Sequence, residues 1–291
     1  MVKKLIYMSS LSLLFMACNE KKETQETFTT GTTELLVEES VLPLTEDLIN
    51  VFQSHYDNSN FDVKVNNESQ LMNLLFKDSV RLAVIPRELT DKEKEFFKNR
   101  VQPIIVPIAK EAIVFIGNKN NNDSLIKYND FLNELKNPNS QKLFILDNVN
   151  SSLVNKIKRD LNGEIVSKNV FYLNETKEVI EYISKTNNAV GVVGSNWLAQ
   201  PDQKTIENKN HLKTFSIFNE NSKNFVKPSQ STIADNTYPL TRTINIIDIK
   251  GNSGLGKGFS SFAAGNIGQR LVLKSGLMPI STPPREVIIK E

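Results

Sequence analysis

Three short polar segments combine hydrogen-bond donors with the predicted start of a helix or the end of a strand. They are Glu39-Ser40 before a helix that begins near Pro43, Pro86-Arg87, and Asn150-Ser151-Ser152 before the helical sequence LVNKIKRDL. The first N–H groups of a helix have no partner within it, and the helix dipole is positive at that end. With serine hydroxyls or a guanidinium nearby, such ends can bind an anion. The chemistry indicated is recognition of an oxyanion.

The same side chains also have purely structural explanations. Ser40, Ser151 and Ser152 can each serve as the N-cap of the helix that follows. An isolated arginine such as Arg87 is commonly a solvated surface charge. Arg87 comes soon after an apolar run that ends at Ile85, however, so a position facing a cleft is equally consistent with the sequence. Both interpretations stay open from the residues alone.

Motifs for other chemistry are incomplete or missing. The segment from Gly251 to Gly258 fits G-x-x-x-x-G-K but ends in glycine, where a P-loop needs Ser or Thr to hold Mg²⁺. The sequence contains neither G-x-S-x-G nor H-E-x-x-H. Its two histidines, His55 and His211, are far apart, and one cysteine cannot form a multi-cysteine metal site. We therefore predict no catalytic activity, no metal and no cofactor.

The amino terminus has the parts of an export signal. Lys3 and Lys4 precede an apolar run of 13 residues from Leu5 to Ala17, too short to span a bilayer as a helix of about 20 residues. The only cysteine, Cys18, follows directly, and this arrangement resembles a bacterial lipoprotein box, whose cysteine is acylated. A free cysteine in an ordinary secreted protein is the alternative. We predict a signal peptide over 1–17 and a lipidated Cys18.

The segment after the signal, 18–33, is rich in Thr, Glu and Lys and has one aromatic residue. Such a composition cannot bury enough apolar surface to order itself, so we predict a flexible tether.

The charge balance of the chain bears on its binding partners. The signal carries two lysines and no acid, so its removal brings the 35 basic residues of the chain into balance with its 33 acidic ones. A basic nucleic-acid-binding surface is therefore not expected.

From Glu34 onward, short runs typical of strands alternate with helical periods. Thr90 and Glu93 form a capping box that predicts a helix start. With 39% hydrophobic residues the chain has ample material for a core. The alternation predicts an α/β fold with largely parallel sheets. The expected strands are at 34–37, 61–65, 81–85, 103–109, 112–117, 142–146, 189–193, 212–218, 243–249 and 287–289, and the expected helices are at 44–55, 71–75, 91–100, 128–135, 153–161, 175–185 and 258–273.

Several segments carry a family resemblance. They are LLVEES (35–40), RLAVIPRELT (81–90), YPLTR (238–242) and GLGKGFSSF (254–262) followed by GQR (268–270). Together they resemble the PstS-like phosphate-binding lipoproteins of ABC importers. The resemblance implies a type II periplasmic-binding-protein fold, in which two α/β lobes close over a small ligand and the chain crosses between them twice. Lobe one would hold 34–111 and 240–291, and lobe two 112–239, with crossings at Lys110-Glu111 and Tyr238-Pro239.

By the same resemblance, the protein would be a monomer anchored to the outside of a bacterial membrane through Cys18. It would capture phosphate, or a similar oxyanion, for an ABC permease. The implied ligand-binding residues are Glu39, Ser40, Arg87, Asp147, Asn150, Ser151 and Ser152. Asp147 stands where the family often has arginine, and Ser-Ser-Leu replaces its Ser-Gly-Thr. Asp147 can accept the proton of monohydrogen phosphate; alternatively, the cleft is degenerate and the lipoprotein serves as a sensory or interaction module.

Overall fold

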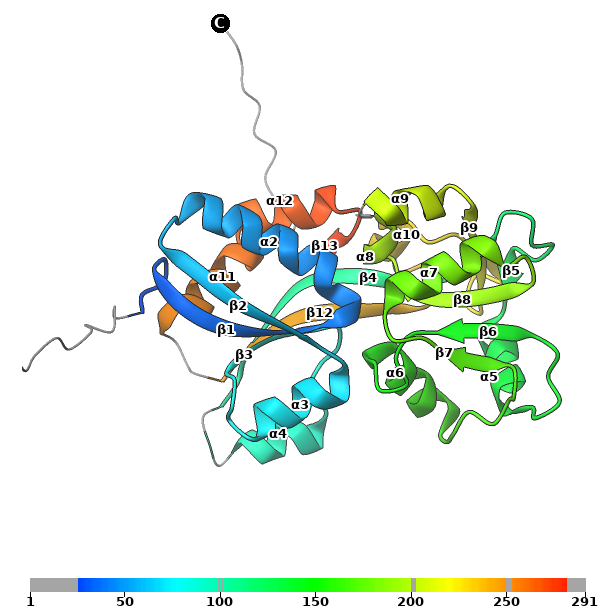
Figure 1. Ribbon diagram of the computed structural model, residues 1–291, viewed down its shortest axis with the longest axis horizontal. Helices are drawn as coiled ribbons and strands as arrows, with labels where there is room; N and C mark the ends of the chain where they lie inside the picture. The colour runs from blue at the N-terminus through cyan, green and yellow to red at the C-terminus, as the bar shows by residue number, and fades with distance from the viewer. Residues whose placement is uncertain (1–25, 99, 101, 200–202, 250–252, 282–291) are drawn as a thin grey trace, which may run out of the picture.

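The computed structural model describes residues 26–98, 100, 102–199, 203–249 and 253–281. Two α/β lobes lie side by side along the longest axis of the molecule, and the long strands β4 and β12 lie where they join (Figure 1). One continuous path of paired strands, in the order β2-β1-β3-β12-β4-β8-β6-β7, runs through both lobes. The α/β class and the two-lobed periplasmic-binding-protein arrangement predicted from the sequence are therefore confirmed.

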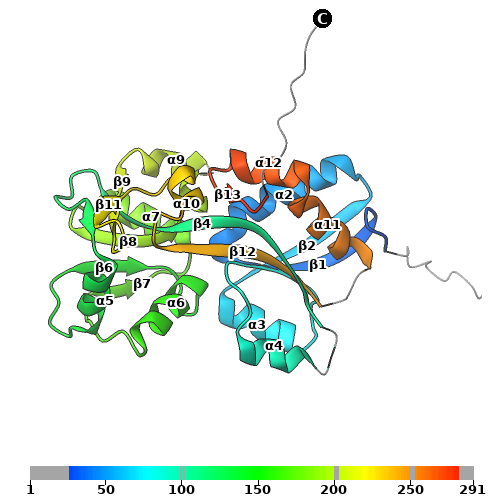
Figure 2. The ribbon, with the colours of Figure 1, turned by 180° about the vertical axis from the view of Figure 1, so that it is seen from behind.

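The first lobe is built on a mixed sheet. Strand β1 pairs in parallel with β2 and β3, whereas β12 pairs antiparallel with β3 and β4. Helices α2, α11 and α12 cover one face and α3 and α4 the other, each over its own apolar cluster (Figures 1 and 2). The bounds are β1 Gly31–Glu38, β2 Ser59–Asn66, β3 Leu82–Ile85, β4 Ile104–Asn118, β12 Thr241–Asp248, α2 Leu42–His55, α3 Glu68–Phe76, α4 Asp91–Lys98, α11 Gly254–Ala264 and α12 Asn266–Lys274.

The second lobe has its own core, formed by residues between Ala112 and Leu240. Its sheet joins the second half of β4 to β8, β6, β7 and β9, and a small separate sheet contains β5, β10 and β11. Further bounds are β5 Leu125–Ile126, β6 Leu143–Leu146, β7 Val170–Tyr172, β8 Ala189–Gly194, β9 Leu212–Thr214, β10 Ser216–Asn219, β11 Asn224–Val226, β13 Met278–Pro279, η1 Glu39–Val41, α5 Tyr128–Lys136, α6 Ser152–Leu161, α7 Thr176–Lys185, α8 Asn196–Ala199, α9 Gln203–Lys209 and α10 Gln230–Ala234.

Strand β4 carries the chain from one lobe to the other without a break. It pairs with β12 as far as Ala112 and with β8 from Ile113 onward. The crossing expected at Lys110-Glu111 lies inside this strand, so the two apolar runs expected as separate strands form one. The exact lobe boundaries stay a prediction. This geometry places Glu111 and its cross-strand partner Arg242 where the lobes meet.

Other differences from the sequence-based expectations have local causes. The helix expected over 258–273 is two helices, because the backbone of Gly265 is extended between them. Strand β1 begins at Gly31, so the end of the predicted tether belongs to the sheet, and Glu26 accepts a hydrogen bond from the backbone of Leu255. The sheets are more mixed than predicted. Residues 1–25, with Cys18, and the strand expected at 287–289 lie outside the described residues.

The predicted capping box at Thr90 and Glu93 is confirmed. The Thr90 backbone donates to the Glu93 carboxylate at 2.7 Å, and the Glu93 backbone donates to the Thr90 hydroxyl at 3.3 Å. Within the described ranges, every helix falls short of the length and apolarity needed to cross a membrane.

Candidate anion-binding site between the lobes

The site is centred on a buried ion pair. Arg242, on β12, donates from Nε to the Glu111 carboxylate on β4 at 2.7 Å, and the two side chains are 5% and 0% exposed. Burial lowers the pKa of Arg242, but the nearby carboxylates Glu111, Glu38 and Asp147 raise it above its usual value, so the guanidinium stays charged. A buried charge of this kind must satisfy its remaining donors within the protein.

The remaining donors of Arg242 connect the two lobes through two serines. Nη2 donates to Ser40 Oγ at 2.9 Å, and Nη1 donates to Ser152 Oγ at 2.8 Å. Ser40 lies in η1, directly after β1 of the first lobe, and Ser152 is the first residue of α6 in the second. The backbone N–H groups of both serines lie at helix starts. We call Arg242, Ser40 and Ser152 the donor cluster.

The donor cluster surrounds the carboxylate of Glu38. Glu38 Oε2 accepts from Ser40 N at 3.1 Å and from the Ser40 hydroxyl, and Glu38 Oε1 accepts from Ser152 N at 3.1 Å. The side chain is completely buried. One carboxylate, supplied by the chain itself, thus receives donors from both lobes, in the manner expected of a bound oxyanion.

The neighbouring carboxylate, Glu39, makes a second link between the lobes. It accepts from Thr176 N at 2.9 Å and from Thr176 Oγ1 at 2.7 Å, at the start of α7. Burial raises the pKa of Glu39 to about 7, although the two hydrogen bonds from Thr176 oppose the shift. The charge at this link therefore changes near neutral pH.

The rest of the third predicted segment, together with Asp147, lies next to the donor cluster. Asp147, just after β6, is buried and accepts from Ser151 Oγ at 2.6 Å, and Ser151 caps α6 by accepting from Val154 N at 3.1 Å. Burial raises the pKa of Asp147 well above its usual value, and Glu38 and Glu39 add to the effect. The Asn150 carbonyl accepts at 3.4 Å from the backbone of Ser69 in the first lobe.

Arg87 is placed in a different network. Its guanidinium pairs with Glu68 at 2.9 Å and with Glu93 at 2.7 Å, both in the first lobe. Glu68 in turn accepts from Asn155 of α6 at 3.1 Å, so this network also touches the second lobe. The structure therefore brings Ser40 and Ser152 together around one group, with Asp147, Asn150 and Ser151 close behind it. The role of each predicted residue in ligand binding stays a prediction.

Sequence reasoning missed four residues of this site: Glu38, Glu111, Asn196 and Arg242. Asn196 is fully buried; its Oδ1 accepts from Leu44 N and its Nδ2 donates to the Ser40 carbonyl, both at 3.0 Å. A usable signal existed for the ion pair only. Glu111 and Arg242 are opposite charges next to apolar runs, on the two segments predicted to lie near the crossings.

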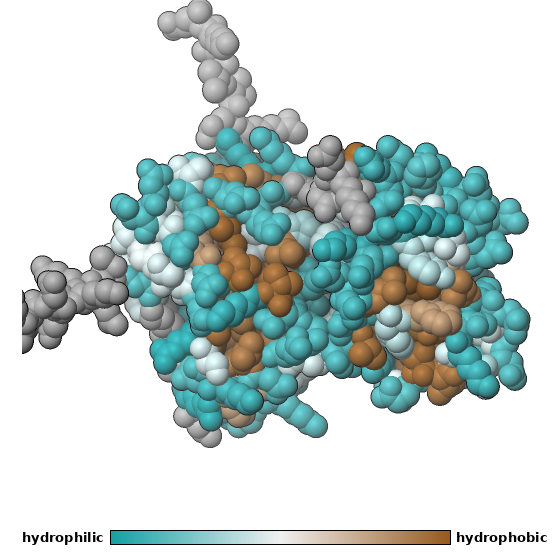
Figure 3. Space-filling model, viewed as in Figure 1, coloured by the Kyte–Doolittle hydropathy of each residue, from teal (hydrophilic) through white to brown (hydrophobic). Residues whose placement is uncertain are grey.

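A cavity of about 290 Å³ lies between the lobes, lined by Glu38 and Glu39. The rest of its lining consists of Val65, Asn66, Asn67, Gln70, Asn148, Ser151, Asn174 and Glu175. These residues include no lysine or arginine. On the face shown in Figure 3, hydrophilic side chains cover the boundary between the lobes. The positive charge of the site therefore comes from Arg242, beneath the serines, rather than from the lining of this cavity.

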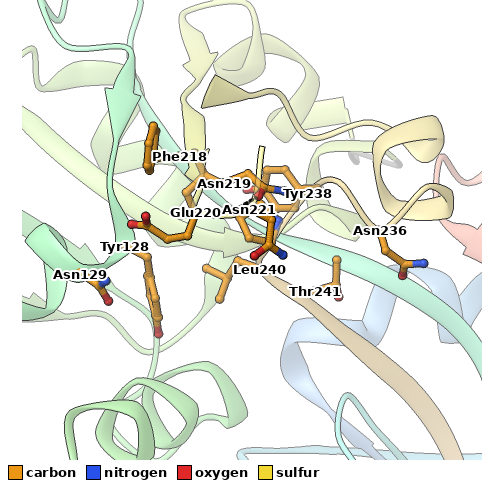
Figure 4. A pocket seen from close by; sticks show the side chains of 12 residues that line it. Tyr128, Asn129, Phe218, Asn219, Glu220, Asn221, Asn236, Tyr238, Leu240 and Thr241 are labelled. Atoms are coloured by element: carbon orange, nitrogen blue, oxygen red, sulfur yellow. Dashed lines mark hydrogen bonds between the residues drawn. The ribbon is translucent and has the colours of Figure 1, made fainter. Parts of the chain in front are cut away.

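A further cavity, of about 420 Å³, lies in the second lobe beside the segment that leads into β12 (Figure 4). Its lining comes from the start of α5, from β10 and the turn after it, and from residues 236 and 238–241. Glu220 is the only charged residue in this lining, so the cavity lacks a cation for an anionic ligand. Among the described residues, no group of His, Cys, Asp and Glu side chains is arranged to hold a metal ion.

The sequence over residues 22–266 matches the family described as the PBP superfamily domain. The chain belongs to this family. The PBP superfamily match covers most of the chain, including the donor cluster, and it confirms the resemblance recognised in the sequence at the level of the family. No curated protein matches the chain.

Solved structures share the PBP fold at low identity. A putative phosphate ABC transporter substrate-binding protein from Clostridium perfringens, with bound phosphate, has 14% identity and a TM-score of 0.72, covering 86% of this chain and all of that one. An ABC-type phosphate transport receptor from Vibrio cholerae has 16% identity and a TM-score of 0.64, over 86% and 100%. The reduced form of the OxyR2 regulatory domain from Vibrio vulnificus has 12% identity and a TM-score of 0.53, over 81% and 93%.

Proposed function

We propose that this protein is an extracytoplasmic solute-binding protein that captures a small oxyanion, phosphate first among them, for an ABC importer. The observation that carries the proposal is the convergence of donors from both lobes on one oxygen-bearing group. Ser40 supplies N–H and O–H from the first lobe, Ser152 supplies N–H from the second, and Arg242 supplies the charge behind them. Donors of this kind suit a tetrahedral oxyanion.

The position of the donor cluster also fits a receptor that closes on its solute. An anion that accepts from Ser40 and Ser152 at once links the two lobes, so its binding energy favours the closed state. Structures described as phosphate receptors share this fold, which supports phosphate as the first solute to test. We propose a binding role rather than a catalytic one, because the hydroxyls of Ser40 and Ser151 donate to buried carboxylates and no histidine is among the residues of the site.

The anchoring part of the proposal rests on the amino-terminal sequence. A signal over 1–17 followed by Cys18 would place the folded part outside the cytoplasmic membrane, held by lipid on the cysteine. With a balanced charge after signal removal, the protein would not depend on electrostatic attraction to the membrane surface. We propose that it works as a monomer beside its permease.

A second candidate function follows from Glu38. Its carboxylate already occupies the donor cluster, so the cleft can equally be one that takes no solute. The protein would then be a surface lipoprotein that serves as a sensory or interaction module. The fold alone does not separate these functions, since an OxyR2 regulatory domain shares it.

Calorimetric titration of the full chain, purified in detergent, with phosphate and sulfate separates the two functions. Capture of phosphate predicts saturable binding of phosphate that the substitution Ser40→Ala weakens, because it removes the donor hydroxyl. Thr205→Ala is a matched control, because Thr205 is a buried hydroxyl residue of α9 outside the donor cluster. Absence of binding by any oxyanion to the wild type would remove the transport proposal and leave the second candidate.

A further inference from the structure

The Glu38 side chain makes the contacts that a bridging ligand would make. Its Oε2 is held by the Ser40 backbone and hydroxyl of the first lobe, and its Oε1 by the Ser152 backbone of the second. Each serine hydroxyl also accepts from Arg242. Two serine bridges therefore connect the guanidinium to this carboxylate, one from each lobe. Glu38 belongs to β1 and needs none of the second-lobe contacts to complete its strand.

Electrostatics prevents Glu38 and an oxyanion from occupying this position together. The single positive charge of Arg242 already faces Glu111 at 2.7 Å, and Glu38 adds a second negative charge. A phosphate dianion within hydrogen-bond distance of the same serines would meet both carboxylates in a site shielded from water. Like charges at such distances repel strongly at low dielectric.

We propose that Glu38 is a resident competitor for the solute: an oxyanion enters the donor cluster only by displacing the Glu38 carboxylate from Ser40 and Ser152. This inference rests on the proposed function in one respect, that the donor cluster is the solute site. The displaced side chain can move into the 290 Å³ cavity between the lobes, because Glu38 is one of the residues that line it. Binding of an oxyanion is then an exchange of the Glu38 carboxylate for the solute at the donor cluster. The side chain at position 38 therefore determines the affinity for the oxyanion.

The test compares phosphate binding to full-length wild type, Glu38→Thr and Glu175→Thr, purified in detergent and titrated by calorimetry with sodium phosphate. Threonine keeps a short oxygen that can cap η1 at Ser40 N but removes the carboxylate. We expect Glu38→Thr to bind phosphate at least about tenfold more tightly, since each charged hydrogen bond that no longer has to be exchanged contributes about that factor.

Glu175→Thr is the matched control. Glu175 lines the same cavity with a side chain 45% exposed, and threonine can replace it as the N-cap of α7. It removes the same charge without touching the donor cluster, so its affinity should stay within about twofold of the wild type, because exposed charges are screened. Thermal melting shows whether each variant folds. Should Glu38→Thr fail to fold, Glu38→Gln, which keeps the size and loses the charge, takes its place.

The outcomes separate this inference from the proposed function. Tight phosphate binding by Glu38→Thr, with weak or undetectable binding by the wild type, supports the proposal that Glu38 competes with the solute. If phosphate binding by the wild type is undetectable, phosphate capture is removed as its function. If the wild type and the folded Glu38 variant bind phosphate with equal affinity, the proposal that Glu38 competes with the solute is wrong, and phosphate capture remains supported. If neither binds phosphate, the donor cluster is not an oxyanion site and the inference fails. An equal gain in Glu175→Thr also overturns it, because general charge would then explain the effect.

Discussion

Arg242 and Glu111 are direct cross-strand neighbours on β12 and β4, and their side chains form a 2.7 Å ion pair where the chain passes between the lobes. The pair lies beneath the two serines that meet from opposite lobes. The ion pair therefore connects the two strands that cross between the lobes to the serine donors proposed to recognise the anion.

Removing one partner of the pair should destabilise the protein strongly. Arg242→Met leaves the Glu111 carboxylate buried without its counterion, which costs about 3–5 kcal/mol. The double substitution Arg242→Met with Glu111→Leu should cost clearly less than the sum of the two single ones. Urea unfolding of the three variants measures this. Lys64→Met is the control, because its pair with Glu34 is exposed and solvent screening leaves it little effect on stability. Additive costs of the two buried substitutions would contradict the coupling.

Glu39 should make stability depend on pH. Its pKa is raised from 4.5 to about 7 by burial, so the folded state keeps a proton that the unfolded state releases. The stabilisation is fully present below pH 4.5 and is lost as the pH rises through 7, by up to about 3 kcal/mol. Glu39→Gln removes this contribution, so the difference in unfolding free energy between variant and wild type should change steadily from about pH 5 to about pH 8. A constant difference over that range would show that Glu39 titrates normally.

Asp147→Asn should have little effect on stability in mildly acidic solution. Burial raises the pKa of Asp147 well above its usual value and thereby favours the protonated form, which asparagine resembles in shape and charge. The wild type loses stability as rising pH ionises this carboxyl, so the variant should become the more stable of the two in alkaline solution. Denaturant unfolding in mildly acidic and in alkaline buffer tests this. A large loss of stability in the variant under mildly acidic conditions would mean that the carboxyl is ionised.

The same substitution tests the role assigned to Asp147 from the sequence. In alkaline solution, where this carboxyl is ionised and phosphate still carries one proton, Asp147 could accept that proton and would repel sulfate, which carries none. We expect the wild type to prefer phosphate and Asp147→Asn to lose much of that preference in parallel titrations. Unchanged discrimination by the variant would exclude Asp147 as the acceptor and direct the search to Glu39.

The unliganded protein should already be closed. Glu38, Glu39 and Asn196 each connect the lobes without any solute. Small-angle scattering of the full chain carrying Cys18→Ser should therefore give the same radius of gyration with and without phosphate. Adding Glu38→Thr and Glu39→Thr removes two of the links and should expand the molecule until phosphate is added. Contraction of the parent chain on adding phosphate would show that these links do not hold it closed.

Cys18 should carry the membrane anchor. Lipidation of this cysteine would hold the protein on the membrane, so Cys18→Ser should release it or leave the signal uncleaved. Detergent phase partition of cells expressing each form measures the distribution, and mass analysis detects the lipid. Ser9→Ala, inside the apolar run, is a control that should partition like the wild type. Unchanged membrane recovery of processed Cys18→Ser would exclude the anchor.

Local sequence patterns were enough to predict the α/β class and most of the helices and strands of both lobes, whereas the family was indicated by a resemblance that a few segments carry. The capping box of Thr90 and Glu93 and the apolar run of β3 are examples, because each depends on neighbours within a few residues. The same patterns located Ser40 and Ser152 at helix starts. They did not predict that these two serines lie around the same group, because the sequence of a helix start is the same whether its N–H groups are capped by the chain or bind a ligand.

The contacts at the boundary between the lobes emerge only in the folded molecule. Glu38 and Ser152 are 114 residues apart, and Arg242 and Ser40 are 202 apart. No periodicity or motif encodes contacts over such separations, because they exist only after β4 and β12 have paired and the lobes have come together. In the sequence, Glu38 is simply an acidic residue after an apolar run, whereas the fold makes it the anion that fills the site.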